Sequence, residues 1–280
     1  MTSQPITKES TDRFDVVDGI RIHYNEAGSG PALLCFHGGG SGANAWGNTR
    51  FNIAELAKHF TVILVDLPGY GESAKDFPLD PNEYRDSFNA RIVKGLMDVK
   101  GIRKAHFYAS SMGGYVGIRF AIDYPDRLDK LVLQAAGPNR DPVLTPRPLE
   151  GIKALGEFVQ HPDRAHMEAM MRLFIPDDDL RTPELVEERW RAASRPGHVE
   201  FQRRVRGMRS SVLLEDARNV KHPVLVLWGA NDRMVPLDES LANLWVFPNV
   251  RLHIWGHAGH FIQYEKTDEF NRTVIDFLTH

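Results

Sequence analysis

The sequence predicts an α/β protein with a mostly parallel, doubly wound sheet that is interrupted by a helical insertion. Short, continuous apolar runs such as Ala32–Phe36 and Thr61–Asp66 are typical of central parallel strands. Helical segments alternate with these runs, which indicates right-handed crossover connections. Between residues 139 and 211 the strand pattern stops, and prolines divide helical segments rich in Arg, Glu and Met. We therefore expect a sheet-based core with a helical cap.

The composition favours a globular protein that acts on a small molecule. Of the 280 residues, 42% are hydrophobic and 25% are charged. The net charge of −3 provides no positive field for binding nucleic acid. Cys35 is the only cysteine and lies in an apolar run, which indicates a buried thiol and a reducing compartment. The polar N-terminus and the lack of a long apolar run predict a cytoplasmic protein without membrane contact.

The first half of the chain is expected to build most of the sheet. Phe14–Tyr24 alternates and turns at Asp18-Gly19, which predicts an antiparallel hairpin. In such a sheet, the binding crevice lies at the carboxyl ends of the strands. The apolar periods predict further strands at Ala32–Phe36, Thr61–Asp66, Ala105–Ser110 and Leu128–Gln134, and helices at Asn52–His59, Ser87–Lys100 and Gly113–Tyr124.

The second half is expected to cover the crevice and then complete the sheet. Strand character returns at Pro223–Trp228 and Val250–Trp255, and a final helix is predicted near residues 268–278. The proline-rich stretch Pro138–Pro148 marks the hinge into the insertion. We accordingly expect the core to comprise residues 1–138 and 212–280, and the cap residues 139–211.

Ser111 is the candidate nucleophile. It follows the predicted strand Ala105–Ser110 and precedes a glycine-containing helix start, which is the pattern of a sharp strand-to-helix turn that exposes a serine. Such a turn needs small residues two positions away on each side, and Ala109 and Gly113 are small, although glycine is more usual at the first position. Choosing Ser110 instead would place Tyr108 and Met112 at the crowded positions, so we favour Ser111.

The segment His37-Gly38-Gly39-Gly40 follows the first central strand and is a candidate oxyanion hole. In that arrangement the backbone N–H groups of Gly39 and Met112 point at the oxygen that gains charge during acyl transfer. The alternative is that the glycines only make a tight turn.

A serine nucleophile needs a base and an acid that orients the base. Asp232 and His260 follow the serine in the order that this kind of fold uses, each in a loop after a predicted strand. Asp232 is preferred to Asp238, which is expected to cap the following helix. His260 is preferred to His257 because it lies at the far end of its loop, where it can reach back over the serine.

Together these features resemble the α/β-hydrolase superfamily, and in detail they are similar to the meta-cleavage product hydrolases of aromatic degradation. The resemblance implies a homodimer that hydrolyses a carbon–carbon bond of a 2-hydroxy-6-oxo-dienoate after enol-to-ketone conversion, with neither metal nor organic cofactor. It rests on the motifs above and on His23–Gly30, His37–Gly40, Gly42, Trp46, Asn48, Val93–Met97, Tyr124–Arg127, Arg189-Trp190, Pro236–Asp238 and Asp268–Asn271.

The resemblance also implies residues that bind the substrate. Arg189, in the cap, occupies the position of an arginine that contacts the substrate carboxylate, and its planar guanidinium suits bidentate binding. Asn48 is a further implied contact. Two positions depart from the family: Ser110 stands where asparagine is usual, and Phe261 where tryptophan is usual. Both are expected to line the substrate pocket.

Other activities use the same framework. A serine at the turn disfavours haloalkane dehalogenase and epoxide hydrolase chemistry, since both need an aspartate there. Carboxylic ester or lactone hydrolysis is the main alternative, because it uses the same three side chains. A ligand-binding receptor that retains a slow triad is a third possibility.

Overall fold

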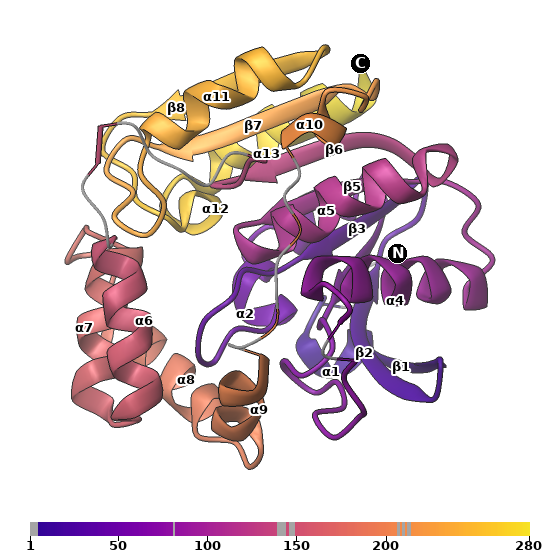
Figure 1. The fold of residues 1–280 in the computed structure, drawn as a ribbon. Coiled ribbons are helices and arrows are strands. Elements are labelled where there is room, and N and C mark those ends of the chain that lie inside the picture. Colours follow the sequence, from indigo (N-terminus) through magenta and orange to yellow (C-terminus); the bar gives the residue numbers. More distant parts are fainter. Residues whose placement is uncertain are drawn as a thin grey trace.

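A mixed eight-stranded sheet organises the protein (Figure 1). The computed structural model describes residues 5–80, 82–138, 144–145, 149–205, 208, 211 and 214–280. The strand order is β1-β2-β4-β3-β5-β6-β7-β8. β2 pairs antiparallel with β1 and β4, and all other neighbours are parallel. The predicted fold class is therefore confirmed.

The strand bounds agree closely with the apolar runs. The hairpin turn has φ of 50° at Asp18 and 77° at Gly19, the left-handed pair that a two-residue turn requires. The strands are β1 Asp12–Val17, β2 Ile20–Ala27, β3 Ala32–Phe36, β4 Thr61–Val65, β5 Ala105–Ser110, β6 Leu128–Gln134, β7 Val224–Gly229 and β8 Val250–Trp255.

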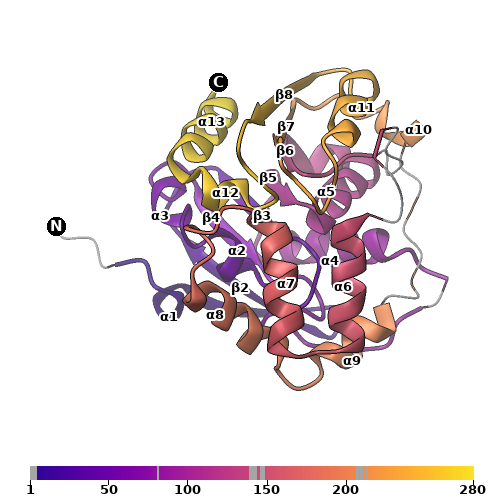
Figure 2. The same ribbon diagram turned by 90° about the vertical axis from the view of Figure 1, so that its left-hand side faces the viewer.

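Helices cover both faces of the sheet and the carboxyl ends of its strands (Figures 1 and 2). No helix of the described part is long and apolar enough to cross a membrane. The helices are α1 Lys8–Thr11, α2 Ala45–Thr49, α3 Ile53–Leu56, α4 Arg85–Val99, α5 Met112–Asp123, the 3₁₀ helix η1 Pro125–Arg127, α6 Glu150–Gln160, α7 Arg164–Phe174, α8 Pro183–Ala193, α9 His198–Val205, α10 Leu214–Ala217, α11 Asp238–Val246, α12 Ile262–Glu265 and α13 Thr267–Thr279.

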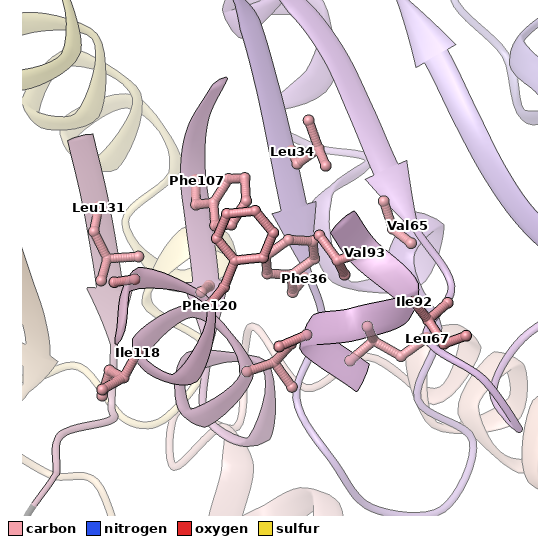
Figure 3. Close-up of a cluster of buried hydrophobic side chains, with 14 of the residues drawn as sticks. Leu34, Phe36, Val65, Leu67, Ile92, Val93, Phe107, Ile118, Phe120 and Leu131 are labelled. Carbon is pink, nitrogen blue, oxygen red and sulfur yellow. The ribbon is translucent and has the colours of Figure 1, made fainter. Parts of the chain in front are cut away.

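Two apolar cores fix the central strands between helices. On one face, Phe107 of β5 makes edge-to-face contacts with Phe36 of β3 and Phe120 of α5, at centroid distances of 4.9 and 4.6 Å. Figure 3 shows this cluster with side chains of β3–β6, α4 and α5 interdigitating. On the other face, Tyr108 packs against Phe270 of α13. Because alternate residues of β5 enter opposite cores, the end of β5 is held rigidly.

Helices α6–α9 lie between β6 and β7 in the sequence and extend across the carboxyl ends of the strands (Figure 2). They contain their own apolar cluster, which includes Phe158, Met170 and Val186. Of the predicted cap limits, residue 139 lies outside the described residues and residue 211 is described, whereas most of the predicted hinge lies outside them.

A buried ionic group ties the antiparallel edge to the loop after β4. The Nδ1 atom of His23 is 2.7 Å from Asp66 Oδ2, and its Nε2 atom is 2.5 Å from Asp12 Oδ1. Burial lowers the pKa of His23, but the bonds and charges of the two carboxylates outweigh it and raise the pKa above its usual value. Burial acts to raise the pKa of Asp66, but contact with His23 outweighs this and holds the pKa at about 2.

We expect His23→Gln to lower the free energy of unfolding by roughly 3–5 kcal/mol near pH 5, because it leaves buried Asp66 without its cation. The pKa of His23 is raised by folding, so its contribution is complete below pH ~6.5 and is lost as the pH rises through the folded-state pKa. Urea unfolding at several pH values should show the difference between wild type and variant shrinking as the pH rises through the raised pKa of His23. Exposed His253→Gln is the control, and a difference independent of pH would contradict the assignment.

Candidate functional site

Ser111 occupies the turn between β5 and α5 in a strained conformation, with φ 51° and ψ −116°. A non-glycine residue rarely adopts a positive φ, and such strain persists only where the surroundings impose it. Here the N–H of Ser111 donates to the carbonyl of Gln134 on β6 at 2.7 Å, and its own carbonyl accepts from Gly114 at 2.8 Å. The turn thus presents the serine hydroxyl at the N-terminus of α5, where the helix dipole favours negative charge.

The glycine loop after β3 lies directly against this turn. A Cβ atom on Gly113 would be 2.7 Å from the carbonyl oxygen of His37, and one on Gly38 would be 3.2 Å from the Cβ of Ser111. His37 fixes the loop, since Leu67 N–H donates to its Nε2 at 3.1 Å and its Nδ1 lies 2.7 Å from the carbonyl of Gly38. Burial lowers the pKa of His37, which keeps the ring neutral for this role.

The two predicted oxyanion donors are placed side by side. A Cβ atom on Gly39 would lie 3.2 Å from the Cβ of Met112. Within the described part of the chain, neither the Gly39 nor the Met112 backbone N–H has an acceptor. Both residues line the same cavity as Ser111. A pair of free N–H groups beside a serine can stabilise an oxyanion.

His260 and Asp232 form a buried pair beyond the ends of β7 and β8. Asp232 Oδ2 is 2.7 Å from His260 Nδ1, and Asp232 Oδ1 accepts from the N–H groups of Met234 and Val235 at 2.8 and 2.9 Å. The His260 backbone is also held, because its N–H donates to the carbonyl of Phe174. Since Asp232 engages Nδ1, the Nε2 atom is the ring nitrogen left to act on Ser111, which lines the same cavity as His260.

The two alternative residues, His257 and Asp238, are not part of this pair. His257 is exposed, with φ of 53°. We expected Asp238 to cap α11, but Leu237 occupies the N-cap position. The Asp238 carboxylate instead accepts from Leu144 N–H at 2.6 Å and Thr145 Oγ1 at 3.1 Å, so it tethers another segment. That prediction was wrong because a tertiary partner competes for the carboxylate.

Glu265 is a second buried carboxylate at this site. Its two oxygens accept from Gly259 N–H at 2.9 and 3.0 Å, immediately before His260 in the chain. Burial raises the pKa of Glu265 to about 7, although the hydrogen bonds from the backbone oppose this rise. The loop that carries His260 is therefore held by a group that titrates near neutral pH.

A cavity of about 350 Å³ opens beside Ser111. It includes four of the predicted residues, Gly39, Ser111, Met112 and His260. Helix α6 and residues 234–235 form an apolar wall, and α4 and α9 form a polar one. No sequence motif pointed to the polar wall, whose side chains are Arg85, Asp86, Asn89 and Gln202.

Arg189 lies next to the cavity rather than among its lining residues. Its Nε–H donates to the carbonyl of Ser41 at 2.8 Å, and the guanidinium lies 5.7 Å from the ring centre of Phe174 and 5.9 Å from that of Phe261. Among the described residues, no carboxylate forms an ion pair with it. Burial lowers its pKa to about 10, so the side chain is still a cation at neutral pH.

The other three predicted substrate contacts also stand outside the cavity lining. Phe261 packs against Phe174 with a centroid distance of 4.9 Å. Asn48 is buried, and its backbone carbonyl accepts a hydrogen bond from the side-chain amide of Gln263. Ser110 is buried, and its hydroxyl has no partner in the described part of the protein. As for metals, no group of three or more His, Cys, Asp or Glu residues among those described could hold an ion.

The chain matches one known protein family over most of its length. The model described as alpha/beta hydrolase fold matches residues 31–267. The chain belongs to the α/β-hydrolase family. This α/β hydrolase is 40% identical to a 2-hydroxy-6-oxo-6-phenylhexa-2,4-dienoate hydrolase of Comamonas testosteroni, over 98% of each chain. It is 36% identical to a 2-hydroxy-6-oxononadienedioate/2-hydroxy-6-oxononatrienedioate hydrolase of Dechloromonas aromatica, over 100% of this chain and 99% of the relative.

Solved structures of other proteins show the same similarity. A meta-cleavage product hydrolase from Pseudomonas fluorescens IP01 superposes with a TM-score of 0.84 at 30% identity, covering 95% of this α/β hydrolase and 97% of the other chain. The predicted resemblance to the meta-cleavage product hydrolases is thus confirmed over the whole length of the protein.

We expect Gly113→Ala to destabilise the protein by about 1–3 kcal/mol and to reduce hydrolysis, because the new methyl group would press on the backbone of the glycine loop. Thermal unfolding and turnover report the two effects. Gly256→Ala is the matched control, since a Cβ atom there meets no atom within 4 Å. Equal behaviour of the two variants would show that the loop and the turn are not in tight contact.

For Glu265→Gln we expect a flatter dependence of stability on pH. A carboxyl group whose pKa is raised on folding binds more protons in the folded state, so stability falls as the pH rises from about 4.5 through about 7, by up to about 3 kcal/mol. Glutamine keeps an acceptor for Gly259 but cannot ionise. Urea unfolding between pH 4.5 and 8 should show the wild-type slope reduced in this variant but unchanged in exposed Glu200→Gln.

Proposed function

We propose that this α/β hydrolase cleaves a carbon–carbon bond of a 2-hydroxy-6-oxo-dienoate formed in the breakdown of aromatic compounds. The observation that carries the proposal is a cation next to the cavity that Ser111 lines. Arg189 is charged, partly buried and without an acidic partner among the described residues, as a site for a substrate carboxylate requires. A simple ester substrate would leave this cation uncompensated.

In this proposal Ser111 is the nucleophile, His260 the base and Asp232 the acid that orients the base. The Asp232 carboxylate fixes the imidazole with Nδ1 protonated, so that Nε2 can take the proton of the serine hydroxyl. The N–H groups of Gly39 and Met112 then receive the negative charge that develops on the carbonyl oxygen. Each step uses a group that lines the cavity or is bonded to one that does.

The proposed cleavage of the carbon–carbon bond needs no cofactor. After the enol becomes a ketone, the serine oxygen adds to the C6 carbonyl, and the C5–C6 bond breaks. The electron pair of the broken C5–C6 bond passes through the conjugated chain to the 2-oxo oxygen of the departing fragment. Protonation of that oxygen gives the dienol. Water then hydrolyses the serine ester, so the products are a 2-hydroxydienoate and a carboxylic acid that carries the 6-substituent. The Arg189 guanidinium favours the carboxylated fragment, where the charge accumulates.

We further propose that Asn48, Ser110 and Phe261 contact the dienoate part of the substrate. The Ser110 hydroxyl is buried without a partner, which supports a role in binding a polar atom. Phe261 and Phe174 form an aromatic surface below the guanidinium. Residues 139–211 would then form the cap over this site.

The protein is also proposed to be a cytoplasmic homodimer. The single, buried thiol of Cys35 suits a reducing compartment. The edge strand β8 and the neighbouring helix α11 support self-association, because α11 exposes Leu241, Leu244 and Trp245.

The decisive experiment is turnover of a 2-hydroxy-6-oxo-dienoate, followed by loss of its visible absorbance. We expect wild type to be active and Ser111→Ala to bind the dienoate without turning it over. In the Ser111→Ala background, Arg189→Met should weaken binding roughly 10- to 100-fold, because the carboxylate loses a charge-assisted bond.

Exposed Arg191→Met, on the same helix, is the control for a general effect of charge. Rapid hydrolysis of p-nitrophenyl esters with no dienoate turnover would favour an ester hydrolase. Saturable binding of the dienoate with negligible turnover of either compound would favour a receptor.

A further inference from the structure

Gln134, the last residue of β6, carries a buried side-chain amide in the interior of the sheet. It has no exposed surface, and it pairs with Ser110 of β5 on one side and with Leu227 of β7 on the other. The backbone turns sharply after it, because Ala135 has a φ of 48° and donates through its N–H to the carbonyl of Leu227 at 3.0 Å. A non-glycine residue keeps such an angle only where its surroundings impose it. The position of Gln134 is therefore fixed by both neighbouring strands.

The backbone and the side chain of Gln134 hold two different parts of the site. Its backbone carbonyl accepts from the N–H of Ser111 at 2.7 Å. Its Nε2 atom donates to the backbone carbonyl of His260 at 2.9 Å, across a separation of 126 residues in the chain. One residue thus bonds directly to the main chain of both Ser111 and His260.

The amide of Gln134 is held in one orientation by its other partners. Its Oε1 atom accepts from the hydroxyl of Tyr108 at 2.7 Å, and its Nε2 atom also donates to Oε1 of Gln263 at 2.6 Å. Gln263 in turn donates to the backbone carbonyl of Asn48 at 3.0 Å. A buried amide with a partner for each polar atom cannot rotate without leaving those partners unpaired, which costs free energy. The bond to the His260 carbonyl is therefore a rigid one.

The other restraints on His260 come from elsewhere in the molecule. Asp232 holds the Nδ1 atom of the ring, and the carbonyl of Phe174, on α7, accepts from the His260 N–H. In the described part of the chain neither Asp232 nor Phe174 forms a hydrogen bond with Ser111. The bond from Gln134 is the restraint that ties His260 to the residue holding the backbone of Ser111.

We propose that Gln134 is a positioning residue, which fixes the approach of the His260 ring to the Ser111 hydroxyl by holding the backbone of both residues. This inference rests on the proposed function only in taking Ser111 and His260 as nucleophile and base, and it does not depend on the substrate. A misplacement of about 1 Å between reacting groups can cost roughly 100-fold in rate. Gln134 does not line the cavity, so its side chain should affect the rate of reaction and not the binding of substrate.

The test replaces the amide by an apolar side chain of similar length, in Gln134→Met, which keeps the backbone bond to Ser111. We expect kcat for the dienoate to fall roughly 10- to 100-fold. The Kd of the dienoate, measured in the Ser111→Ala background with and without Gln134→Met, should change by less than about threefold.

A second measurement needs no dienoate. Diisopropyl fluorophosphate reacts with a serine nucleophile when the serine oxygen bonds to phosphorus, fluoride leaves, and the hydroxyl proton passes to the base. The second-order rate constant of this reaction at Ser111 should fall in Gln134→Met by a factor similar to the fall in kcat, because both depend on the same pair of side chains.

Two control variants separate positioning from a general loss of stability. Val274→Ala removes buried packing from α13 in the core on the same face of the sheet, so it should lower the thermal midpoint of unfolding. Its kcat and its rate of phosphonylation should stay within about threefold of wild type at temperatures where it is folded. Exposed Gln160→Met should alter neither rate. If Gln134→Met does not fold, Gln134→Asn takes its place, since its amide is one methylene group too short to reach His260.

Three results would overturn the inference: an unchanged phosphonylation rate in the Gln134 variant, a loss confined to Kd, or an equal loss of rate in Val274→Ala. If wild type turns over no dienoate but is phosphonylated at Ser111, the proposed function fails while the phosphonylation rates still decide the role of Gln134. If mass spectrometry finds no adduct on Ser111 of wild type, the assignment of the nucleophile is wrong and the inference fails with it.

Discussion

The close contact between two backbone turns underlies the whole site. The strained turn at Ser111 and the glycine loop after β3 approach so closely that a single methyl group at Gly113 would not fit between them. The parallel pairing of β3 with β5 brings the two turns to the same edge of the sheet. Because aromatic cores hold β5 from both faces, the turn cannot relax, and two free N–H groups stay aligned beside the serine. The alignment of these N–H groups therefore results from the packing of β5.

Charge is distributed around this contact in an ordered way. The carboxylates of Asp232 and Glu265 lie buried behind His260 and are stabilised by backbone N–H groups rather than by cations. Arg85 and Arg189, which have no acidic partner among the described residues, lie on the cavity side: Arg85 contacts the Sδ atom of Met112, and Arg189 donates to the carbonyl of Ser41. Burial, with a smaller effect of these two charges, lowers the pKa of His37. The interior thus places carboxylates behind His260 and leaves two cations on the side of the cavity.

The sequence predicted the framework better than the recognition surface. Short apolar runs specified β3, β5 and β6 to the residue, since buried parallel strands have few alternatives. The bounds of the more exposed edge strand β8 were also predicted to the residue. The order of serine, acid and base followed from loops at strand ends. Asp238 was misassigned because its carboxylate is taken by residues distant in the chain. Arg85, Asn89 and Gln202 form no motif: they meet only because α4 and α9 pack around one cavity, and neither periodicity nor spacing encodes that meeting.

Two hydrogen bonds join helices α8 and α9 to the segment that follows the glycine loop. Helix α8 reaches the carbonyl of Ser41 through Arg189, and His198 of α9 accepts from the N–H of Gly42 at 2.9 Å. Both bonds end on the segment that continues directly from the glycine loop. Displacement of these helices would therefore remove two hydrogen bonds from the segment next to Gly39. The placement of α8 and α9 and the alignment of the glycine loop are thus coupled through two hydrogen bonds.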